Sequence, residues 1–172
     1  MGGQFPKVDW RRLTCNNLSC PKWTFILQLA LMERLATKDR LLKWGIIDSA
    51  TYPLCDNMDE SHNHLFFECS YSMRVWTKLL KWQSITRTVR RWQEEKSWAT
   101  SNASGRSVQA DIYKMCLFGA VYHIWLERNV RVFSQGQKED KALVKQIIQE
   151  VFVRASMNRK IAAKLAQMNY YP

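Results

Sequence analysis

Residues 108–133 constrain the fold most strongly, because their apolar positions recur with the 3.6-residue period of an α-helix. One series comprises Val108, Ile112, Met115, Cys116, Gly119, His123, Leu126, Val130 and Phe133, and a second face adds Leu117, Val121, Ile124 and Trp125. A helix that is apolar on two sides is buried on two sides. At 1.5 Å per residue it would be about 38 Å long, enough to run through a small domain as its central element. We expect His123 to be a core histidine rather than a base or ligand.

Other segments also predict helices. Apolar residues with helical spacing follow Pro21, a residue suited to the first position of a helix. Thr37 is a candidate N-cap for a short helix that reaches Trp44 and ends at Gly45. A further helix is expected after Ser70, which would be its N-cap, and another over residues 141–155. The predicted fold class is therefore mainly α: a small helical domain with a zinc-knuckle loop, intact or degenerate, and a long central helix.

The expected organisation follows from shifts in composition. We predict an N-terminal arm over residues 1–20, a helical zinc-knuckle region over 21–96, and a linker over 97–107, whose sequence SWATSNASGRS is small and polar. A helical C-terminal region over 108–166 would pack on the knuckle region, and residues 167–172 would form a tail.

The stretch from Tyr52 to Trp76 contains the residues that could bind a metal. Cys55, His64 and Cys69 lie within fifteen positions, with His62 beside them. Cysteine thiolates and imidazoles are the usual ligands of structural zinc, which takes four. The sequence therefore predicts a zinc site at Cys55, His64, Cys69 and His62.

The fourth ligand is the open question of this site. A knuckle would normally begin with a C-x-x-C pair, but Tyr52 stands three residues before Cys55, and a phenol with a pKa of about 10 is a poor zinc ligand. Asp56, Asp59 and the distant Cys20 are weaker alternatives to His62. The remaining possibility is a metal-free remnant, in which the cysteines and His64 are small buried polar residues.

At these residues the sequence resembles the zinc-binding domain that follows the reverse transcriptase in plant LINE-type retrotransposons. The resemblance rests on three blocks in the family's order: Pro21–Gly45; Cys55, Glu60, His64 to Phe67, Cys69 and Val75-Trp76; and IWLERNVRVF at Ile124–Phe133. Tyr52 departs from the pattern at the family's first cysteine. The resemblance implies the accessory region of an RNA-directed DNA polymerase.

We expect no catalysis from this chain. It contains no Y-x-D-D or F-x-D-D motif, no paired carboxylates suited to two magnesium ions, and no glycine-rich phosphate loop. It also lacks the H-x-E and P-C-x-x-C spacings of the zinc deaminases.

A basic segment follows the knuckle, with no acidic residue between Cys69 and Gln93. Basic side chains interleaved with aromatic rings are typical of proteins that bind single-stranded nucleic acid, since the charges contact phosphates and the rings stack on bases. The candidate nucleic-acid-binding residues are Arg74, Lys78, Lys81, Trp82, Arg87, Arg90, Arg91 and Trp92. Trp76 lies on the apolar stripe and is expected in the core. Residues 154–164 form a second basic segment.

These observations favour a non-catalytic nucleic-acid-binding module. The net charge of +11 points to an anionic partner, RNA or DNA, ahead of a membrane surface, and no small-molecule substrate is expected. The alternative is a domesticated retroelement fragment that acts as a protein-interaction or assembly subunit of a larger complex, or one without a selected role. Five cysteines, an odd number, and the lack of a signal peptide indicate a reducing, intracellular location, nuclear or cytoplasmic.

Overall fold

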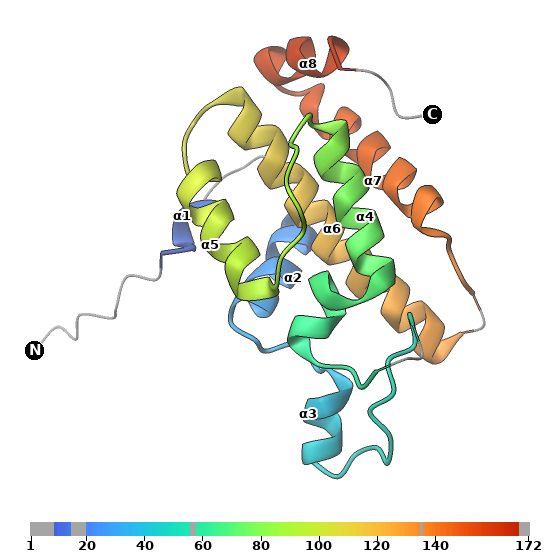
Figure 1. Ribbon diagram of the computed structural model, residues 1–172. Coiled ribbons are helices and arrows are strands. Elements are labelled where there is room, and N and C mark those ends of the chain that lie inside the picture. The colour runs from blue at the N-terminus through green and yellow to red at the C-terminus, as the bar shows by residue number, and fades with distance from the viewer. Residues whose placement is uncertain (1–8, 15–19, 56–57, 135, 169–172) are drawn as a thin grey trace, which may run out of the picture.

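The computed structural model describes residues 9–14, 20–55, 58–134 and 136–168, and within them the protein is helical without a strand (Figure 1). The elements are α1 (Arg11–Thr14), α2 (Pro21–Leu31), α3 (Lys38–Lys43), a π-helical turn η1 (His64–Glu68), α4 (Ser70–Trp82), α5 (Trp92–Ala103), α6 (Val108–Phe133), α7 (Asp140–Ala155) and α8 (Arg159–Ala166). The predicted mainly α fold with a long helix is confirmed. None of the described helices is both long and apolar enough to cross a bilayer.

Helix α6 is the centre of the fold, as its two apolar faces predict. It contacts α2, α4, α5, α7, α8 and η1, and Figure 1 shows it running through the bundle between them. Its middle residues, from Ile112 to Val121, are all buried. Ser107 caps it by accepting a hydrogen bond from the amide of Ala110 at 3.1 Å. His123 is buried, with its ring edge-on to Trp23, as expected of a core histidine.

Gly119 lets three helices meet closely at the middle of α6. A Cβ atom at this position would lie 3.0 Å from Cγ2 of Ile147 in α7 and 3.3 Å from Cη2 of Trp23 in α2. Both neighbours are fully buried, so neither has free space to retreat into. The glycine is thus required by packing rather than by a backbone turn.

Most predicted helix bounds agree with the structure. Pro21 occupies the first turn of α2, and α7 begins one residue earlier than expected. Helix α3 starts after Thr37 and is followed by Gly45 with a φ of 67°. Thr37 is the N-cap of α3, as predicted, although its side chain makes no capping hydrogen bond. The predicted cap Ser70 was wrong, because Cys69 is the N-cap of α4.

The predicted linker over residues 97–107 was wrong in its first part, because residues 97–103 belong to α5. The small residues Ala99 and Ala103 are buried, and α5 packs against α6. The polar side chains bond within the helix: Thr100 Oγ1 donates to the carbonyl of Lys96, and Asn102 Nδ2 to that of Trp98. Small and polar residues therefore permit a close helix contact here instead of a break.

A buried ion pair joins the knuckle region to α6. Both side chains are almost fully buried, and Arg128 Nε and Nη2 donate to the two carboxylate oxygens of Glu60 at 2.9 and 2.8 Å. The backbone amide of Lys38 also donates to Glu60 Oε1 at 2.9 Å, so this carboxylate takes the place of the missing Thr37 side-chain bond at the start of α3. One carboxylate thereby links α3, the segment before η1 and the C-terminal part of α6.

Gly119→Val should destabilise the fold by about 1–3 kcal/mol, because the added methyl groups would overpack the contact with Ile147 and Trp23. Urea or thermal unfolding measures the change. The matched control is Gly105→Ala, where a Cβ meets nothing within 4 Å. This variant should be more stable than the wild type by about 1 kcal/mol or less, because alanine lowers the conformational entropy of the unfolded chain. Equal stability of the two variants would contradict this account of Gly119.

Candidate metal centre

Three potential metal ligands, Cys55, His64 and Cys69, converge at the end of the bundle where the knuckle loop meets α4. One ligand atom from each lies within 4.8 Å of the others. Cys55 Sγ is 3.2 Å from His64 Nε2. Cys69 and His64 are buried, and Cys55 is half-buried. Three separate pieces of backbone, a loop, a π-helical turn and a helix start, therefore present one group that could hold a metal ion.

The π-helical turn explains how His64 and Cys69 come together. The amide of Cys69 donates to the carbonyl of His64 at 2.9 Å, a bond between residues five apart. Such a turn is wider than an α-helical one and frequently occurs at functional sites. It lets residues five apart face the same side, which an α-helical turn would not. The five-residue separation of His64 and Cys69 in the sequence is the spacing that a π-helical turn brings together.

The two buried candidate ligands differ in protonation in the metal-free chain. Burial lowers the pKa of His64, so its imidazole is neutral near pH 7. Burial raises the pKa of Cys69 to about 11, so that thiol is protonated in the metal-free chain and must lose its proton on binding. The second imidazole nitrogen of His64, Nδ1, is buried without a hydrogen-bond partner.

Tyr52 lies beside the three candidate ligands, but its phenol is hydrogen-bonded to the backbone. Its phenol is fully buried and donates to the carbonyl of Leu65 at 3.1 Å. Its ring stands edge-on to His64, with 5.1 Å between the ring centroids. Burial also raises the pKa of the phenol well above its usual value, which disfavours the phenolate form that a metal would bind. Tyr52 thus anchors the loop and packs against a ligand without being one.

His62, predicted as the fourth ligand, is not brought into the group. Its ring packs edge-on against Trp92 at 4.8 Å and Phe66 at 5.4 Å, and burial lowers its pKa to about 4. His62 and His64 are two apart and turn to different surroundings. Cys20 likewise lies outside the group, at the start of α2. Asp59 is exposed, and Asp56 lies outside the described residues.

Trp92 was wrongly predicted to stack on nucleic-acid bases. It is 2% exposed and lies parallel to Phe67, 5.5 Å between centroids, inside the core. Trp76 is fully buried, as expected, and its indole donates to Glu95 at 3.1 Å. Trp82 is partly buried and packs against Phe152 of α7.

Most of the predicted nucleic-acid-binding cations are paired with carboxylates. Arg87 contacts both oxygens of the buried Glu95, at 2.6 and 2.7 Å, and covers the ring of Trp98. Arg74 and Lys78 both reach Asp140 at the start of α7, at 3.0 and 2.7 Å. Arg91 lies 3.2 Å from Glu68, and Arg90 lies 4.0 Å from Glu94. Lys81 is exposed. The segment itself is free of acids, but Glu68, Glu94 and Glu95 flank it in the sequence, and the fold brings Asp140 to it from a distance.

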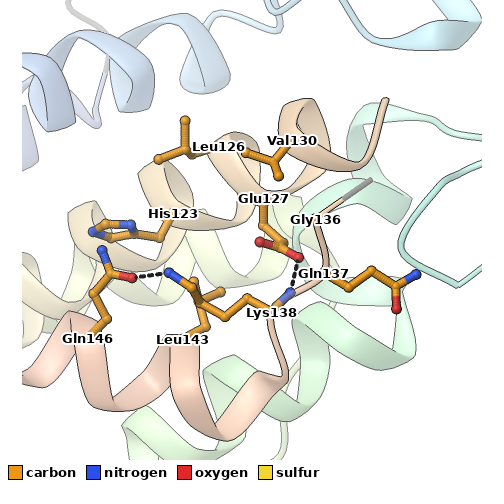
Figure 2. A pocket seen from close by; sticks show the side chains of 9 residues that line it. All are labelled: His123, Leu126, Glu127, Val130, Gly136, Gln137, Lys138, Leu143 and Gln146. Atoms are coloured by element: carbon orange, nitrogen blue, oxygen red, sulfur yellow. Dashed lines mark hydrogen bonds between the residues drawn. The ribbon is translucent and has the colours of Figure 1, made fainter. Parts of the chain in front are cut away.

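A separate pocket of about 220 Å³ lies between α6, α7 and residues 136–138 (Figure 2). Its polar groups already bind one another: Glu127 accepts from the amide of Lys138 at 2.7 Å, and Lys138 Nζ donates to Gln146 at 2.6 Å. His123 forms part of the wall, with Nε2 3.1 Å from a carboxylate oxygen of Glu150. Its chemistry is independent of the metal group.

Comparison with known protein families gives one match, and it covers the metal group. Residues 1–76 match the model of a family described as zinc-binding in reverse transcriptase. The matched range includes Cys55, His64 and Cys69, and it ends within α4, so it covers less than half of the chain. The third block of the resemblance, at 124–133, lies outside it and stays a prediction. No curated protein and no solved structure matches. In its first 76 residues the chain is thus similar to the zinc-binding region of reverse transcriptases.

Proposed function

We propose that this chain is a zinc-stabilised, non-catalytic accessory module that binds nucleic acid, of the kind associated with LINE-type reverse transcriptases. The observation that carries the proposal is the convergence of Cys55, His64 and Cys69 within a region similar to a zinc-binding family. Two thiols and one neutral imidazole are a ligand set that favours zinc over hard cations such as magnesium.

The proposed role of the zinc is structural. Cys55 belongs to the knuckle loop, His64 begins η1, and Cys69 is the N-cap of α4. A metal ion held by all three would cross-link these pieces, which supplies folding free energy. Cys55, His64 and Cys69 would supply three of the four ligands that structural zinc takes.

Two observations support a non-catalytic role. The most buried carboxylates are neutralised by arginines: Glu60 by Arg128, and Glu95 by Arg87. Neither is therefore available as a general base. The matched family is defined by zinc binding rather than by polymerase chemistry.

The nucleic-acid part of the proposal rests on charge. The net charge of +11 remains after the internal ion pairs form, because each pair removes one positive and one negative charge from the surface. A surplus of this size attracts a polyanion and gives sequence-independent binding through phosphates.

Zinc content and stability test the metal site. We expect about one zinc per chain in protein purified without chelator, and its loss in Cys69→Ser. Zinc at one hundred times its Kd would stabilise the native state by about 2.7 kcal/mol, so chelator should lower the Tm by about 5–10 °C. The control is Cys116→Ala, a buried cysteine of α6 outside the group, which should keep its zinc. Zinc-free wild-type protein with a melt indifferent to chelator would overturn the zinc proposal.

Tyr52→Phe separates an anchor from a ligand. The variant removes the phenol that donates to Leu65 and leaves the ring against His64. We expect unchanged zinc content and a loss of about 0.5–1.5 kcal/mol in stability, the usual value of one hydrogen bond. Loss of the zinc in Tyr52→Phe would show instead that the phenol coordinates the metal.

Nucleic-acid binding is tested with the wild-type chain and a labelled 20-nucleotide single strand, as RNA and as DNA. Fluorescence anisotropy should give an affinity that falls linearly with salt on logarithmic axes, with a slope of about 0.7 per phosphate contact. Binding that is absent at 50 mM salt, or that is independent of salt, would contradict this part of the proposal.

A further inference from the structure

One end of the bundle carries basic side chains, on α8 and on the last turn of α4. Figure 1 shows α8 at this end, beside the C-terminal ends of α4 and α7. The ring of Trp82, the last residue of α4, packs against Phe152 near the end of α7, with centroids 6.0 Å apart. Helix α8 in turn packs on α7 and α6. These contacts fix the ends of α4, α7 and α8 relative to one another.

The charge at this end is of one sign. Residues 151–168 contain four cationic side chains and no carboxylate. Three of these cations, Arg159, Lys160 and Lys164, are exposed on α8, and Lys81 is exposed in the last turn of α4. The fourth, Arg154, is partly buried and covers the ring of Trp23. We call Lys81, Arg159, Lys160 and Lys164 the basic corner.

The cations of the basic corner differ from those between Arg74 and Arg91 in whether they form ion pairs with carboxylates. In that segment, Asp140, Glu95 and Glu68 each lie within 3.2 Å of a cation. No ion pair joins Arg159, Lys160 or Lys164 to a carboxylate among the described residues. A phosphate that binds the corner therefore displaces only water and counterions, whereas one that binds the other segment competes with a carboxylate.

The helix that carries the corner packs its large apolar side chains against the bundle. Its apolar residues Ile161 and Leu165 are each 1% exposed and face the bundle. Asn158 caps its N-terminus by accepting hydrogen bonds from the amides of Lys160 and Ile161 at 3.1 and 3.3 Å. Because the apolar side is used in packing, α8 cannot insert it into a lipid surface, as an interfacial helix does. Binding at the corner is left to the side-chain cations.

We propose that the basic corner is the surface that contacts the phosphate backbone of a nucleic acid. This inference rests on the proposed function and places the contact on the second basic segment and Lys81, rather than on the paired cations between Arg74 and Arg91. Lys160 and Lys164 are four residues apart, so they lie on one side of α8, about 5–6 Å apart at their Cβ atoms. Two cations in such a row follow a strand and give contacts that do not depend on base sequence.

The test is a triple variant with a matched control. Arg159→Glu, Lys160→Glu and Lys164→Glu together change the net charge by six units. The control reverses three exposed cations elsewhere, Arg11, Arg34 and Lys43, and changes the net charge equally. Both are measured against the labelled single strand over a range of salt, with melts to confirm folding. A milder variant, with glutamine at the same three corner positions, replaces the triple reversal if that one melts early.

We expect the corner variant to lower affinity on the order of 100-fold at 0.1 M salt and to reduce the salt slope by about two, at about 0.7 per lost contact. The control should lose much less. Equal loss in both variants would mean that net charge alone decides binding, and no loss in the corner variant would place the contact elsewhere. Either result would contradict the assignment of the phosphate contact to the basic corner, while leaving the proposal of nucleic-acid binding intact.

Two further outcomes separate the corner from the proposed function. If the folded wild-type chain binds neither the RNA nor the DNA strand, both the proposed nucleic-acid binding and the assignment of the contact to the basic corner are wrong. Vesicles that contain one-third phosphatidylserine serve as the competing polyanion. Tighter, corner-dependent binding to these vesicles than to the nucleic acid would assign the corner to lipid and contradict our inference.

Discussion

The buried pair of Glu60 and Arg128 is the interaction on which the arrangement of the knuckle depends. Both charges are removed from water, and each carboxylate oxygen accepts from the guanidinium, while Lys38 adds a backbone donor. Removing one partner of such a pair leaves an uncompensated buried charge, which typically costs about 3–5 kcal/mol. The pair holds the segment before η1 on the C-terminal half of α6.

The metal group and the helical core are continuous with one another. Cys69 is both a candidate ligand and the first residue of the turn that starts α4. Helix α4 then places Trp76 beside Glu95, which is held by Arg87. Among the residues that sequence suggested for nucleic-acid contact, Arg74 and Lys78 thus join α4 to α7 through Asp140, and Arg87 binds Glu95 of α5. These cations are paired with carboxylates of the same chain, whereas the unpaired exposed cations described above lie on α8.

The sequence predicted what depends on local periodicity. The bounds of α6 follow from its own apolar pattern, and the convergence of Cys55, His64 and Cys69 follows from ligand types at close spacing. It did not predict what depends on distant residues. Asp140 lies 66 positions from Arg74, and a count of charges along the chain cannot reveal that they meet. His62 and Trp92 illustrate the same limit, since each was predicted at a functional surface, and the fold packs their rings together in the core. The segment 97–103 was read as a linker because small residues suit loops, although they suit tight helix contacts equally well.

The anchoring of Tyr52 has a consequence for the lifetime of a bound ion. Its phenol ties the knuckle loop to the backbone of Leu65, and its ring supports His64, whether or not an ion is present. A loop restrained in this way would not need to fold or unfold for an ion to enter or leave. The tyrosine therefore prepares His64 and the knuckle loop for an ion before one binds.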